Sequence, residues 1–441
     1  MLGLKEMPPQ QQTTSQAQAV PPAPVQPPTP KRSSKKLVIA LVVLVILIAG
    51  VGSGLIFLPK YQGTQYVAKV KPAALALKNS TAEVNQTISQ MYATITGNQN
   101  PTAPGGDLRV SGLLIHPEIA LLSPSSNVLG VSTNPGLIES AVENIARQTK
   151  GTVSSLSEIH KKVAAASTSP ADLIDSQFRQ LISESQTAKD KTGQAQTDLD
   201  SALTSIHNQP FLLSGDVKQK IAQDSSLEND VKPYIDESSK ISGYYEVTSN
   251  TIIGINTDIT SFKTALNSAQ ASFSQITPSA SPSAIQTALQ QSQIYLNQAK
   301  KSSDDIKNLS QTLKNIPAQN LPTGSDKYQE HNIQVLETVT TYFDAESKIF
   351  QSFIDASNAL LAKINTNSVT QNDLTDYQNT LATGGQNATL ADTQFISDLQ
   401  ALVGEEKNLT LDFWQNSQIF SKSQKAQQSL TTLIDNLDSV K

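Results

Sequence analysis

Apolar side chains recur along most of the chain at alternating spacings of three and four residues, the repeat of one face of an α-helix. The first stripe runs from Val67 to Ile95, with Thr81 as a polar member. Similar stripes cover residues 138–163, 174–206 and 241–276. At about 1.5 Å per residue, these stripes predict helical rods of roughly 40 to 55 Å.

Proline marks where several of these helices begin. Asn134-Pro135, Ser169-Pro170 and Ser281-Pro282 each place a capping side chain before a proline, which is favoured at the first helical position. A fifth helix is therefore expected from Pro282 to about Ile316, before Pro317.

The C-terminal third continues the helical pattern. Residues 326–366 carry two adjacent apolar stripes, which predict a central helix with several neighbours. A last long helix is expected after Gly384-Gly385. Long helices joined by short loops predict an all-α, elongated bundle of antiparallel helices with coiled-coil-like seams, in two segments, 59–231 and 232–441.

One apolar run is of a different kind. Residues 37–58 contain no charged side chain and span about 33 Å as a helix, the thickness of a bilayer core. Gly50, Gly52 and Gly54 lack the spacing of a dinucleotide-binding loop. The run is too long for a cleaved signal peptide. It predicts one transmembrane signal-anchor helix, in which Gly50 and Gly54 form a GxxxG motif that permits homodimerisation.

Basic residues predict the orientation of this span. Lys31, Arg32, Lys35 and Lys36 precede it, whereas only Lys60 follows within ten residues. The positive-inside rule then places the N-terminus in the cytoplasm and the C-terminal part outside. Over twenty residues the two flanks carry equal numbers of basic residues, so the prediction rests on the cluster next to the membrane.

Composition narrows the possible partners. Residues 1–36 form a Pro- and Gln-rich tail with a net charge of +4, expected to be disordered. The whole chain has a net charge of −5, so the residues after this tail carry a net charge of −9, which disfavours nucleic acid as a partner. Cysteine is absent, which excludes disulfides and thiolate metal sites.

Residues 98–135 form a long connection that is unusually apolar. Its apolar side chains either fold back onto the end of the bundle or form an exposed patch for a partner. The residues in question are Leu113, Leu114, Ile115, Leu121 and Leu122.

Motifs for catalysis are missing. The four histidines fall in different segments, with no HExxH or Glu-x-x-His pair, so exposed or partnerless histidines are expected. No phosphate-binding loop or nucleophile elbow occurs, and no cofactor is expected. Glu346 and Glu406 stand out because they lie on apolar seams, where each either turns outward to a lysine or makes a buried contact that fixes helix register.

These patterns predict a non-enzymatic, membrane-anchored scaffold or adhesin-like protein-binding module of a bacterial cell envelope, with an unidentified protein partner. A receptor that binds a small ligand between its helices is the alternative from another class. If the orientation is reversed, the pattern fits a cytoplasmic division or cytoskeletal factor.

Overall fold

The computed structural model is all-α over the residues it describes. For residues 34–60 and 170–177, and for a few single positions elsewhere, it describes the backbone alone. The described residues are 34–99, 170–210, 213, 215–221, 226–276, 280–366 and 368–440.

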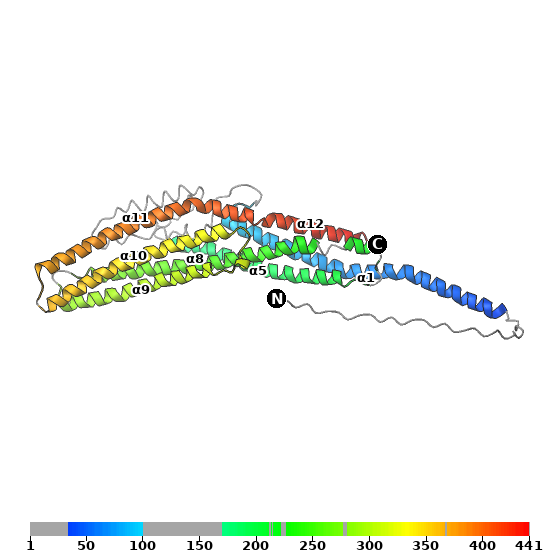
Figure 1. The fold of residues 1–441 in the computed structure, drawn as a ribbon, viewed down its shortest axis with the longest axis horizontal. Helices are drawn as coiled ribbons and strands as arrows, with labels where there is room; N and C mark the ends of the chain where they lie inside the picture. Colours follow the sequence, from blue (N-terminus) through cyan, green and yellow to red (C-terminus); the bar gives the residue numbers. More distant parts are fainter. Residues whose placement is uncertain are drawn as a thin grey trace, which may run out of the picture. The chain divides into compact units, whose positions relative to one another are not determined.

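Two compact units divide the chain, residues 1–59 and residues 60–441. Helix α1, Ser34–Thr96, crosses this boundary (Figure 1). The predicted membrane span, residues 37–58, lies in α1, but its side chains are outside the described part. Among the residues whose side chains the structure describes, no helix is long and apolar enough to cross a bilayer.

The unit 60–441 is a bundle of long helices (Figure 1). Short elements accompany them: α6, Gly215–Ile221, a π-helix at Leu227–Val231 that leads into α8, and a 3₁₀ turn at Ala318–Asn320. The long helices besides α1 are α5, Pro170–His207; α8, Lys232–Phe273; α9, Pro282–Lys314; α10, Asp326–Asn365; α11, Gln371–Asn416; and α12, Ile419–Asp438.

Side-chain contacts show that neighbouring helices are antiparallel. Between α9 and α10, Lys314 pairs with Glu337 near one end, and Gln293 donates to Gln351 (3.0 Å) farther along. Helices α10 and α11 also run in opposite directions, because Tyr342 is hydrogen-bonded to Asp392 whereas Ser357, later on α10, is hydrogen-bonded to Tyr377, earlier on α11. The predicted helical bundle is thereby confirmed.

Several predicted helix boundaries are confirmed. Helix α5 begins at Pro170, and α9 begins at Pro282 after Ser281, whose hydroxyl accepts a hydrogen bond from the Ala284 amide (3.2 Å). The stripe at 67–95 lies in α1, where Val70, Leu77, Ile88 and others are fully buried. The stripe at 138–163 and the Asn134-Pro135 start lie outside the described residues.

The predicted start of the last helix is wrong. Helix α11 already begins at Gln371, after a Thr370–Asp373 capping box, and runs through Gly384-Gly385 without a break. The interruption comes at Ser417-Gln418, where Gln418 adopts a left-handed conformation (φ 53°). Tyr92 of α1 fixes this bend, since its ring lies 5.3 Å from both Trp414 and Phe420.

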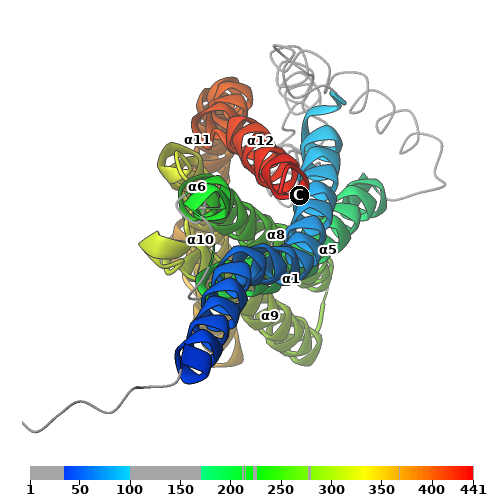
Figure 2. The ribbon, with the colours of Figure 1, turned by 90° about the vertical axis from the view of Figure 1, so that its right-hand side faces the viewer.

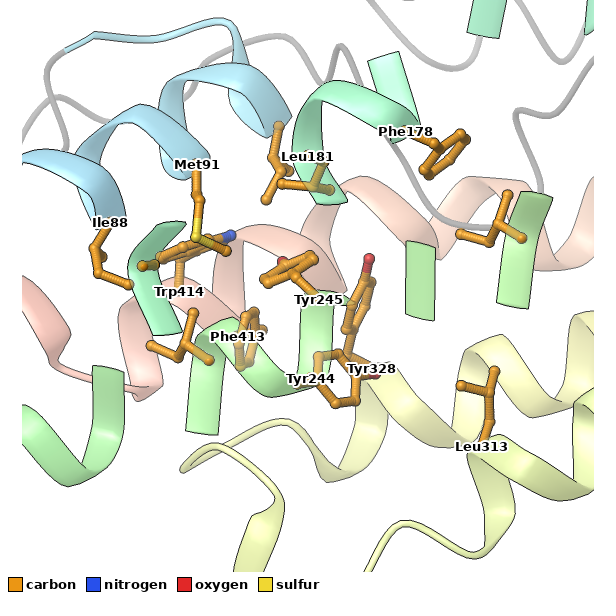
Figure 3. Close-up of a cluster of buried hydrophobic side chains, with 14 of the residues drawn as sticks. Ile88, Met91, Phe178, Leu181, Tyr244, Tyr245, Leu313, Tyr328, Phe413 and Trp414 are labelled. Carbon is orange, nitrogen blue, oxygen red and sulfur yellow. The ribbon is translucent and has the colours of Figure 1, made fainter. Parts of the chain in front are cut away.

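Aromatic side chains from several helices pack together in one buried cluster (Figure 3). Tyr245 of α8 stacks on Trp414 of α11 with ring centroids 5.7 Å apart. Phe413 of α11 stacks on Tyr328 of α10 at the same distance. Met91 of α1 points into the same cluster, which therefore joins four helices in one core.

Helix α10 has several neighbours, as its wide apolar arc predicts. It packs along α9 on one side and α11 on another. Its Phe343 also stacks on Phe262 of α8, with ring centroids 3.7 Å apart. Figure 2, a view turned by 90°, shows the packed helices of the bundle close to end-on.

Candidate functional site

Hollows lie along the seam between α10 and α11, and we call them together the α10–α11 groove. The inner lobe has a volume of about 530 Å³ and the tip lobe about 660 Å³. The inner lobe is lined by Glu337, Thr341 and Tyr342 of α10 and by Gln394, Phe395 and Asp398 of α11, among others. The tip lobe is lined by Lys348, Ile349 and Ser352 of α10 and by Asp376, Thr383 and Gly384 of α11, among others.

The two lobes belong to one groove. On α10 their lining residues follow one another at helical spacing, so they occupy a single face. On α11 the same holds in the opposite direction. The α10 series is 334, 338, 341, 345, 348 and 352, and the α11 series is 376, 380, 383, 387, 391, 394, 398 and 402. The α10 wall alone is about 27 Å long.

Aromatic rings form the floor of the inner lobe. Tyr342 and Phe395 are buried and stack across the two helices, with ring centroids 4.4 Å apart and planes at 19°. Tyr342 also donates a hydrogen bond to the buried Asp392 carboxylate (2.9 Å). Burial, followed by the nearby Glu346 and Asp392 carboxylates, raises the pKa of Tyr342 well above 10. The phenol therefore stays protonated and keeps donating at neutral pH.

Leu390 is an exposed residue of α11 next to residues that line the groove. It is 67 % exposed, the largest value among the exposed large apolar side chains of the described residues. It lies one helical turn before Gln394 and directly before Ala391, both of which line the inner lobe.

The polar side chains that line the inner lobe are carboxylates, amides and hydroxyls. The lining of the inner lobe contains no histidine, serine or basic side chain. In the part of the chain that the structure describes, no three His, Cys, Asp or Glu residues gather as metal ligands would. Shape, apolar floor and polar rim all favour a ligand held by packing and hydrogen bonds.

Most predicted site residues cannot be placed. Lys31 and Arg32, as well as the apolar patch Leu113 to Leu122, lie outside the described residues. Lys35, Lys36, Gly50 and Gly54 belong to α1, where the structure describes only the backbone. Their proposed roles in orientation, dimerisation and partner binding stay predictions.

The two seam glutamates are buried, at 2 % exposure for Glu346 and 0 % for Glu406. Of the two alternatives, this burial excludes the one in which each side chain turns outward. Their proposed part in fixing helix register stays a hypothesis.

The histidines differ from one another in the described part of the chain. His207 is exposed at the end of α5, as expected. His331 of α10 is instead buried, at 3 % exposure, and burial lowers the pKa of its imidazole, with Glu405 opposing the shift. His116 and His160 lie outside the described residues.

Sequence reasoning missed the groove, although two signals pointed toward it. The apolar face of residues 326–366 is wider than the surface that the adjacent helices cover, so Tyr342 and Ile349 of this face line the groove. Leu390 interrupts a polar stretch of α11, outside the apolar seam of that helix.

Comparisons of the chain with protein-family models, with curated proteins and with solved structures found no match.

Proposed function

We propose that the protein is a non-enzymatic, membrane-anchored module that binds another protein in a bacterial cell envelope. The observation that carries the proposal is the α10–α11 groove, a long hollow with an apolar floor, a polar rim and an exposed leucine at its edge. Such a surface on a rigid helical support is what recognition of a partner requires.

The anchor in this proposal is the uncharged run at residues 37–58, whose length matches a bilayer core. The basic cluster before it favours a cytoplasmic N-terminus and an extracytoplasmic bundle. The bilayer is then one partner and a second protein the other. Gly50 and Gly54 permit a homodimer through the span.

The first test is the accessibility of a C-terminal tag to protease in intact and in permeabilised cells. Digestion in intact cells supports the envelope location. Protection until permeabilisation overturns it and favours a cytoplasmic division or cytoskeletal role for the same bundle. A tag before Met1, outside the basic cluster, serves as the matched control and should show the opposite protection.

A small-ligand receptor is the second candidate, favoured by the inner lobe, whose 530 Å³ is within the size range of small-molecule sites. A thermal-shift screen against small metabolites separates the two functions. A specific rise in melting temperature that Phe395→Ala abolishes would favour the receptor, because a ligand that binds only the folded state stabilises it.

A further inference from the structure

We propose that the α10–α11 groove accepts an amphipathic α-helix of a partner protein, apolar along one face and basic toward the end that lies beside Glu337 and Asp398. This inference rests on the proposed protein-binding function and names the kind of partner.

The shape of the groove fits a helix. Two antiparallel helices leave a straight furrow between them, and a third helix packs there at the usual interaxial distance of roughly 8 to 10 Å. The furrow is about 27 Å long on α10, enough for five turns of a partner helix. An extended strand is disfavoured, since helix walls present no backbone edge for it to pair with.

Side chains in the groove alternate in size as helix packing requires. Ala345, Ala391 and Ala401 leave gaps between larger neighbours, so apolar side chains of an entering helix find room there. Tyr342 and Phe395 provide the buried floor on which those side chains rest. Leu390 then covers the flank of the bound helix.

Charge gives the bound helix a direction. The inner lobe and the hollow that continues from it along α10, about 440 Å³, are lined by Asp326, Glu330, Glu337 and Asp398 and by no basic residue. Glu337 also pairs with Lys314 on its α9 side. The tip lobe is balanced, with Lys348 and Asp376. Basic side chains of the partner therefore belong at the inner end, where the potential is negative.

The same charges argue against other occupants. In two copies of this chain joined groove to groove, Lys348 would be the one basic lining residue that each copy could offer to the other's carboxylates, so the charges would be poorly matched. Anionic lipid and nucleic acid are repelled by the same carboxylates.

The test uses the full chain in detergent and a fluorescent 20-residue peptide with leucines at helical spacing and lysines at one end. A peptide of the same composition with the leucines scattered is the matched probe. We expect at least a tenfold tighter Kd for the striped peptide. The double variant Glu330→Lys/Asp398→Lys should weaken its binding about tenfold, while Asp200→Lys on the exposed face of α5 leaves it unchanged. Equal binding of both peptides, or no effect of the double variant, overturns the inference.

The natural occupant is tested by crosslinking, which the absence of cysteine makes simple. The variant Gln394→Cys carries a photoreactive maleimide in native membranes, and Gln290→Cys on the exposed face of α9 is the control. We expect a crosslink from position 394 alone, to a peptide with an apolar helical stripe and basic residues. A crosslink to residues of the same chain, or to a second copy, overturns the partner helix.

The two proposals fail differently. If the tag experiment places the bundle inside the cell while the striped peptide binds, only the envelope location falls. If the bundle is outside but the striped and scattered peptides bind alike, only the helix-binding inference falls.

Discussion

Gly384 is the position where α11 approaches α10 so closely that an added methyl group has no room. A Cβ atom there would lie 2.1 Å from Cε1 and 2.4 Å from Cζ of Phe353. Carbon atoms prefer separations of about 3.5 to 4.0 Å, so the ring would have to retreat by more than about 1 Å. Phe353 is 3 % exposed and packs beside Phe350 and Phe273, which block that movement.

The expected effect of Gly384→Ala combines two opposing contributions. Alanine favours a helix interior over glycine by about 0.5 to 1 kcal/mol. Overpacking a closed core costs about 1 to 3 kcal/mol. We expect a net destabilisation of about 1 to 2 kcal/mol.

Two other helical glycines are matched controls for Gly384. A Cβ at Gly193 meets no atom within 4 Å, so Gly193→Ala should stabilise the protein by about 0.5 to 1 kcal/mol. A Cβ at Gly254 lies 3.0 Å from a methyl group of Leu309, which can shift slightly, so Gly254→Ala should be nearly neutral. Of the three variants, Gly193→Ala should thus be the most stable, Gly254→Ala intermediate and Gly384→Ala the least stable.

Urea unfolding followed by tryptophan fluorescence measures these differences, because Trp414 is the single tryptophan and is buried. Shortening the obstructing side chain with Phe353→Leu should recover part of the loss in Gly384→Ala. If Gly384→Ala stabilises the protein as much as Gly193→Ala does, α10 and α11 do not approach as closely as the structure shows, and the groove beside them has a different width.

Three further predictions concern buried titratable side chains. Glu237 is 4 % exposed and accepts a hydrogen bond from Lys422 (3.1 Å), so Glu237→Ala should lower the free energy of unfolding in urea by about 3 kcal/mol. The double variant Glu237→Ala/Lys422→Met should lose less stability than the sum of the losses in the two single variants. If Glu346 and Glu406 fix helix register, replacing both by leucine should alter the oligomeric state in sedimentation; an unchanged state with a raised melting temperature refutes that role. Burial lowers the pKa of His331 below 6.5, so its contribution to stability is complete above that pH and is lost as the pH falls below it. His331→Gln should therefore reduce the change in the urea unfolding midpoint between pH 7.5 and pH 5. An unchanged dependence of the midpoint on pH would contradict this.

The sequence by itself determined that the chain is helical and where several helices lie. Apolar spacing placed residues 67–95 and 174–206 in α1 and α5. The helix predicted from Pro282 to about Ile316 is α9, which ends two residues earlier at Lys314, and Ser281-Pro282 marked a start that the cap geometry confirms. These features are local, since helical periodicity and capping depend on residues within a few turns of each other.

Only the tertiary structure decided how these helices meet. Gly384-Gly385 resembled a break, yet α11 continues through it because the missing side chain lets Phe353 approach. The real bend at Gln418 follows from packing against Tyr92, more than three hundred residues away. The groove likewise depends on which faces of α10 and α11 remain uncovered once α9 and α8 have packed. An apolar stripe predicts that one face of a helix is buried, but which other helix covers that face depends on contacts between residues far apart in the sequence.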